Sequence, residues 1–95
     1  MRVKLIDQAK DDLADIAKHY HGLGGTTLAR KMVQKIKKPT LALKDNPYIA
    51  PPYELAEGVH RFTVADGLFY VFYRVLLDIE VLHIRRAERE AAEKF

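Results

Sequence analysis

The residues best suited to binding chemistry lie at the end of the stretch 67–86, GLFYVFYRVLLDIEVLHIRR. His83, Arg85 and Arg86 follow a run that is rich in β-branched and aromatic residues. Arginine binds phosphates through paired hydrogen bonds, and aromatic rings beside it stack on bases. Read with a period of two, the run is apolar on both faces, which predicts a strand in the middle of a sheet. We therefore expect this stretch to form both part of the core and a cationic working surface.

A predicted hairpin brings a second strand against this run. The Asp-Gly pair at 66–67 is the strongest short hairpin signal in the chain, and the residues before it alternate as in a strand. As a two-residue loop, this pair places Thr63 opposite Tyr70. The same register places Arg61 opposite Phe72.

A second predicted turn extends the surface. A two-residue loop at 77–78 places Arg74 opposite Val81, Phe72 opposite His83 and Tyr70 opposite Arg85. One sheet face is then expected to stay open and to carry the candidate site residues Arg61, Tyr70, Phe72, Arg74, His83 and Arg85. The other face is expected to pack on helices and to carry Phe62, Val71, Ile84, His60, Tyr73 and Leu82. An open face with arginines and exposed aromatic residues is typical of phosphate or protein binding.

Each candidate residue also has a structural interpretation. A single histidine in a strand is more often structural than catalytic. Arg74 has a carboxylate within reach in Glu80 or Glu57. Tyr70 and Phe72 would equally well complete a core. A slip of one residue in either register would move every side chain to the opposite face.

Two amphipathic helices are expected before these strands. Residues 9–20 carry apolar side chains at helical spacing, and three glycines within 22–25 favour a tight connection. A second apolar stripe over 28–36 predicts another helix, which Pro39 would either kink or break at Lys38, and we favour a kink. With a short first strand at 3–6, the predicted order is β-α-α-β-β-β. This is an α+β fold with a small antiparallel sheet of three to four strands and a helical hairpin packed on one face.

The second predicted helix carries cations on its polar face. Lysines stand at 31, 35 and 38, with Arg30 and Lys37 nearby. Charged rows on exposed helices are common, so we interpret this face as solvated and keep phosphate binding as the alternative.

Length and composition indicate a single domain over residues 1–95. Hydrophobic content of 48% and charged content of 31% leave no tract that argues for disorder. Without cysteine, neither disulfides nor a Cys-based zinc site is available, and we expect no metal and no cofactor. The amino terminus lacks an apolar signal core, and no run approaches the roughly 18 residues that span a bilayer, so we expect a cytoplasmic protein. The tail at 87–95 is expected to form a short C-terminal helix that frays or docks only with a partner.

Several short motifs, in this order, resemble the RelE/ParE superfamily of toxins from bacterial type II toxin–antitoxin modules. They are AKDDL at 9–13, an Asn-Pro turn at 46–47, Tyr-Arg-Val at 73–75 and VLHIRR at 81–86. The likeness covers nearly the whole chain. It implies a small antiparallel sheet with a helical hairpin, in agreement with the registers above.

The two branches of this superfamily imply different activities. Members similar to ParE inhibit DNA gyrase and have no established catalytic set, whereas members similar to RelE cleave mRNA in the ribosome. For the RelE branch, the resemblance implies His83 as base or acid and Tyr70 as a stacking or proton-donating group. It implies Arg61 and Arg85 as phosphate clamps. The HIRR ending and the long helical hairpin look more like ParE, so we favour a non-enzymatic gyrase inhibitor over an endoribonuclease.

The resemblance also implies a cognate antitoxin that covers the toxin's apolar and basic grooves in a hetero-oligomer. The formal net charge of +3 suits an acidic antitoxin segment. The residues expected to meet the partner or target are Arg61, Tyr70, Phe72, Arg74, Arg85 and Arg86. A third interpretation, an inactive toxin or a simple nucleic-acid-binding module, rests on the lysines of the second helix alone.

Overall fold

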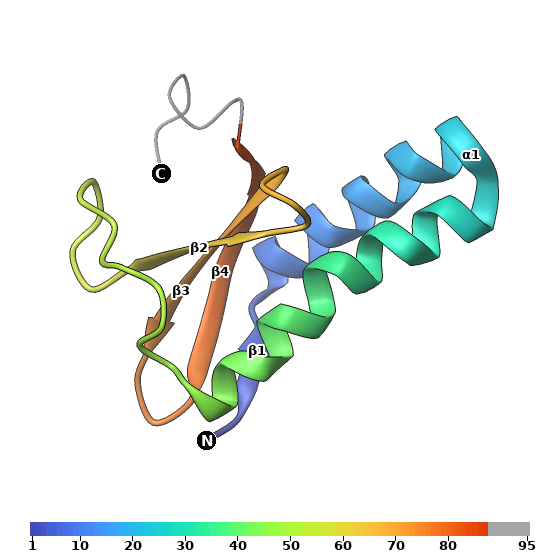
Figure 1. Ribbon diagram of the computed structural model, residues 1–95. Helices are drawn as coiled ribbons and strands as arrows, with labels where there is room; N and C mark the ends of the chain where they lie inside the picture. Colours follow the sequence, from blue (N-terminus) through green and yellow to red (C-terminus); the bar gives the residue numbers. More distant parts are fainter. Residues whose placement is uncertain (88–95) are drawn as a thin grey trace.

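The computed structural model describes residues 1–87 and has an α+β fold, in which a long bent helix packs on a sheet of four strands (Figure 1). The helices are α1 (Asp7–Leu41) and the 3-10 helix η1 (Ala42–Asp45), and the strands are β1 (Val3–Leu5), β2 (His60–Val64), β3 (Phe69–Val75) and β4 (Ile79–Arg86). The predicted α+β succession of one strand, a helical region and three strands is confirmed, but one helix, α1, spans both predicted helices and η1 follows it. The helix predicted for 87–95 lies, from residue 88 onward, outside the described residues.

Helix α1 contains both arms of the predicted helical hairpin. Gly24 and Gly25 have non-helical backbone angles and separate the two arms. At Gly25 φ is 76°, in the left-handed region that residues with a Cβ rarely adopt, so glycine allows the chain to reverse there. The second arm runs through Pro39 to Leu41, so the proline does not end the helix. The tip of the hairpin extends past the sheet (Figure 1).

The sheet is mixed, which corrects the expectation of a purely antiparallel one. Its strand order is β1-β4-β3-β2, and β1 pairs with β4 in parallel through Val3↔Ile79 and Leu5↔Val81. A parallel neighbour requires a long connection, and the chain between β1 and β4 contains the whole helical hairpin and two further strands. Because β1 has only three residues, the rest of β4 has no strand beside that edge among residues 1–87.

The β2–β3 hairpin has the predicted register, with Thr63 opposite Tyr70. Asp66 and Gly67 both have positive φ, 57° and 86°, and Leu68 N–H donates to the carbonyl of Ala65 at 3.1 Å. These are the features of a type I′ turn, whose twist matches that of the strands. The turn is also held against the second arm of α1, because Lys35 Nζ lies 2.9 Å from Asp66 Oδ2.

The predicted two-residue loop between β3 and β4 is wrong. Val75 pairs with Ile79, so three residues, 76–78, connect the strands, and Arg74 lies opposite Glu80 instead of Val81. Further along, the register shifts by one residue at a bulge, where Leu82 has no partner on β3.

Beyond the bulge, in the half of the hairpin far from the loop at 76–78, the strands pair as the sequence predicts. Phe72 lies opposite His83, and Tyr70 lies opposite Arg85, as the sequence predicts. The longer loop and the bulge each displace the register by one residue, and the two displacements cancel. Leu82 is the exception: it was expected on the helix-facing side but packs beside Phe72.

Two clusters of buried side chains cover the two faces of the sheet. The larger one joins the sheet to α1 and η1, and its members include Ala9, Met32, Ile36, Leu43, Phe69, Val71, Tyr73, Ile79, Val81 and Ile84. The smaller one consists of Tyr53, Val59 and Phe72, so residues 51–59 fold over the face that was expected to be open. Phe72 is only 1% exposed, which corrects its assignment to an exposed aromatic surface.

A buried carboxylate joins the first arm of α1 to the edge of β4. Asp12 Oδ2 accepts a hydrogen bond from the backbone N–H of Ile84 at 3.0 Å, and Oδ1 accepts one from Gln8 Nε2 at 2.9 Å. This N–H lies on the part of β4 that β1 does not reach. Asp12 therefore provides an acceptor that a longer β1 would otherwise have provided.

We predict that Asp12→Ala lowers the free energy of unfolding by about 1–3 kcal/mol, because it leaves the Ile84 N–H buried without an acceptor. Asp12→Asn keeps one oxygen and should lose less. Urea denaturation of both variants measures the difference. The exposed neighbour Asp11 is the control, and Asp11→Ala should stay within about 0.5 kcal/mol of the parent. Equal losses in Asp11→Ala and Asp12→Ala would contradict this role.

Candidate functional site

Arg61 lies against two aromatic rings on the sheet face that residues 51–59 partly cover. Its guanidinium carbon is 4.4 Å from the centre of the Tyr70 ring and 5.6 Å from that of Tyr53. Both distances are within the range of cation–π attraction. The predicted neighbourhood of Arg61 and Tyr70 is therefore present, and Tyr53 is a further member that the registers did not reveal.

Arg74 forms an ion pair across the β3–β4 hairpin. Its Nε and Nη2 lie 2.8 Å and 2.7 Å from Glu80 Oε1. Of the two carboxylates that the sequence offered, Glu80 is the partner. Both side chains are partly exposed, so the pair contributes little to stability. Arg74 thus has a structural contact of its own, separate from the cluster around Arg61.

His83 and Arg85 lie together near the free edge of β4. Arg85 Nη2 is 3.2 Å from His83 Nδ1, and Asp12 Oδ2 is 3.8 Å from the same nitrogen. Because a guanidinium can only donate, His83 Nδ1 accepts this hydrogen bond and its proton resides on Nε2. Partial burial, and then the charge of Arg85, lower the pKa of His83 below its ordinary value, while Asp12 opposes them. His83 is therefore neutral at pH 7, and its contact with Asp12 is not an ion pair.

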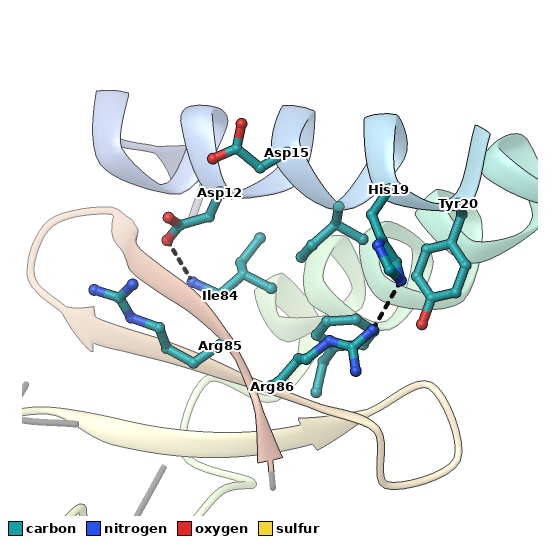
Figure 2. Close-up of a pocket in the computed structure, with 9 residues that line it drawn as sticks. Asp12, Asp15, His19, Tyr20, Ile84, Arg85 and Arg86 are labelled. Carbon is teal, nitrogen blue, oxygen red and sulfur yellow. Dashed lines mark hydrogen bonds between the residues drawn. The ribbon is translucent and has the colours of Figure 1, made fainter. Parts of the chain in front are cut away.

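A groove of about 250 Å³ runs between the first arm of α1 and β4 (Figure 2). Its lining residues are Asp12, Asp15, Ile16, His19, Tyr20, Phe69, Ile84, Arg85 and Arg86. Arg86 Nη2 donates to His19 Nε2 at 3.1 Å, which links the two walls near one end. Carboxylates stand on the helix side and guanidinium groups on the strand side, above an apolar floor (Figure 2).

The chemistry of this groove suits a polypeptide better than a reacting small molecule. Apolar side chains at the bottom give contact area, and charges of both signs at the rim fix orientation. Among residues 1–87, no group of three His, Asp or Glu side chains could hold a metal ion.

The structure brings five of the sequence-predicted residues into two groups. One is Arg61 with Tyr70, on the sheet face, and the other is the set His83, Arg85 and Arg86, at the edge of β4. The helix wall of the groove was missed. The signal for it was available, because Asp12 stands three residues after Ala9 and four before Ile16, on the apolar stripe of the helix, where a carboxylate must find a buried partner.

Comparison with solved structures places this fold among the toxins of bacterial toxin–antitoxin modules. A chain described as belonging to the chromosomal ParDE TA system from P. aeruginosa superposes with a TM-score of 0.81 at 32% sequence identity, over 90% of this chain and 95% of that chain. A family model described as ParE toxin of type II toxin-antitoxin system, parDE, matches residues 3–91. The chain belongs to this ParE toxin family. Comparison with curated proteins gave no match.

The helices of the structure are too short or too polar to span a membrane. Within residues 1–87, none is long and apolar enough to cross a bilayer.

We predict that acidification destabilises the fold through His83. Its pKa is lower in the folded than in the unfolded chain, so protonation favours unfolding. This contribution to stability is complete above the unfolded value of 6.5 and is lost as pH falls from there through the folded pKa. Urea denaturation between pH 7.5 and 5 should show a smaller loss of stability in His83→Gln, which can still accept from Arg85, than in the parent. An identical pH dependence in both proteins would contradict the assignment of a neutral His83.

Proposed function

We propose that this ParE-family chain acts in the cytoplasm as a growth-inhibiting toxin that binds DNA gyrase, without being an enzyme, and that a cognate antitoxin neutralises it. The observation that carries the choice of gyrase over mRNA is the state of His83. A general base must offer a free lone pair to the proton it takes. Arg85 Nη2 lies 3.2 Å from Nδ1 of His83, and a guanidinium that donates there occupies the lone pair that a base would use.

The placement of the other candidate residues supports the same choice. Arg61 is stacked on Tyr70, and Arg74 is paired with Glu80. Arg85 and Arg86 contact histidines. Cations supported in this way by neighbouring side chains suit a preorganised protein-binding surface, in which arginine and tyrosine often contribute most of the affinity.

We propose the groove between α1 and β4 as the binding site of the antitoxin. Its apolar floor matches an apolar stripe on a peptide segment, and Arg85 and Arg86 attract carboxylates. The antitoxin would then neutralise the toxin, because it would occupy Arg85 and Arg86, which we also propose to contact gyrase.

The test is a supercoiling assay with purified gyrase and the purified chain. We expect the chain to inhibit supercoiling and to leave ribosome-bound mRNA whole. Replacement of Arg86 by alanine should raise the concentration needed for half-inhibition about tenfold or more, the effect of losing one hydrogen bond to a charged group. Lys44→Ala removes an exposed cation elsewhere and is the matched control, which should leave inhibition unchanged.

The alternative, an mRNA interferase built on His83, Arg61, Arg85 and Tyr70, predicts the opposite pattern. It requires mRNA cuts on the ribosome that disappear in His83→Ala, with gyrase unaffected. That result would replace the proposed function. Expression of the chain without an antitoxin distinguishes both activities from an inactive toxin. Cells that express an inactive toxin would continue to grow at the normal rate.

A further inference from the structure

All charged side chains on the second arm of α1 are positive. Between residues 26 and 41 it contains no Asp or Glu, and it carries five cations: Arg30, Lys31, Lys35, Lys37 and Lys38. All five are exposed residues. Charged rows on ordinary solvated helices usually contain both signs, which stabilise one another at a spacing of three or four residues. This arm lacks such pairs.

The cations are spaced regularly along the arm. Lys31, Lys35 and Lys38 are four and three residues apart, which places them on one stripe of the helix. With a rise of about 1.5 Å per residue, the five charges span roughly 12 Å along the axis. A DNA duplex presents one phosphate charge per about 1.7 Å of its axis, so several phosphates lie within reach of this stripe.

Most of this charge is not neutralised by the described part of the chain. Lys35 Nζ lies 2.9 Å from Asp66 Oδ2. Its hydrogen bond and charge, and to a lesser extent the charge of Lys31, hold the pKa of the Asp66 carboxyl below its usual range. Within residues 1–87, Arg30, Lys31, Lys37 and Lys38 form no ion pair. The face therefore retains a strong positive potential, although the net charge of the whole chain is only +3.

The other exposed residues on the arm indicate what kind of partner fits. From residue 26 to 38, every exposed residue is Thr, Gln, Lys or Arg: the five cations with Thr26, Thr27 and Gln34. Protein interfaces depend on apolar or aromatic anchors, and this face has none. Lys, Arg, Thr and Gln are side chains that contact DNA phosphates, and the absence of aromatic rings disfavours stacking on single-stranded bases.

We propose that this cationic face, Arg30 to Lys38 on the second arm of α1, binds the phosphate backbone of duplex DNA without sequence preference. It lies on the second arm of α1, whereas the groove between α1 and β4 is built on the first arm. DNA binding through this face requires neither gyrase nor an antitoxin. A test of it can therefore fail without affecting the proposed function, and the reverse also holds.

The test is fluorescence anisotropy of a labelled 20-base-pair DNA duplex titrated with the full chain over a series of salt concentrations. We expect log K to fall linearly with log salt concentration. The double variant Lys31→Gln, Lys38→Gln should bind about tenfold or more weakly at low salt, and its slope should be shallower by about 0.9 for each phosphate that the variant no longer neutralises. Two duplexes of unrelated sequence should bind equally.

The matched control is Lys18→Gln, Lys44→Gln, which removes the same charge from exposed positions on the first arm and η1. It should keep most of the affinity, and circular dichroism should show equal helix content in all three proteins. Equal losses in both double variants would overturn the proposal, because net charge alone would then explain binding. No binding at low salt, or equal binding of polyglutamate, would also overturn it. An RNA duplex that binds more tightly through the same lysines would contradict the choice of DNA.

Discussion

The hydrogen bond from the Ile84 backbone N–H to the carboxylate of Asp12 determines how the charged residues of this toxin are arranged. Strand β1 is too short to pair with the outer half of β4, and Asp12 supplies the acceptor that the missing strand would have supplied. The bond holds the first arm of α1 beside a strand edge without closing that edge. The space that remains is the groove, with aspartates on the helix wall and arginines on the strand wall (Figure 2). The bond between Arg86 and His19 links the same two walls near one end of the groove.

The bulge at Leu82 is the second constraint on the site. It lets Leu82 join the apolar cluster around Phe72, while His83 lies near Asp12 and Arg85. In a regular strand, consecutive residues alternate strictly between the faces, and one extra residue changes which side chains reach the edge. This placement lowers the pKa of His83, because partial burial first, and then the charge of Arg85, disfavour its protonated form.

The two arms of α1 differ in charge although they form one hairpin. The first arm, from Asp7 to Leu23, has four aspartates against two lysines, and the second has five cations and no carboxylate. The acidic arm helps to line the groove, where a partner's charges of both signs can be matched. Between residues 26 and 38, the exposed side chains of the cationic arm are all polar or positively charged. Under the two proposals above, the groove would meet a protein partner and the cationic arm would meet phosphate.

The sequence by itself determined the order of strands and helices, the glycine reversal in the helical hairpin and the register of the β2–β3 hairpin, because these depend on local patterns of apolar residues and turn residues. The pairing of Tyr70 with Arg85 and of Phe72 with His83 was also predicted, but only because a longer loop and a bulge compensate for each other. Only the tertiary structure decided that β1 lies parallel to β4, since residues far apart in the chain form that pair. It also decided that Tyr53 covers Phe72, and that Asp12, in the apolar stripe of a helix, meets a strand edge. Those contacts depend on how the segments pack, and no local pattern records which distant segment a side chain will meet.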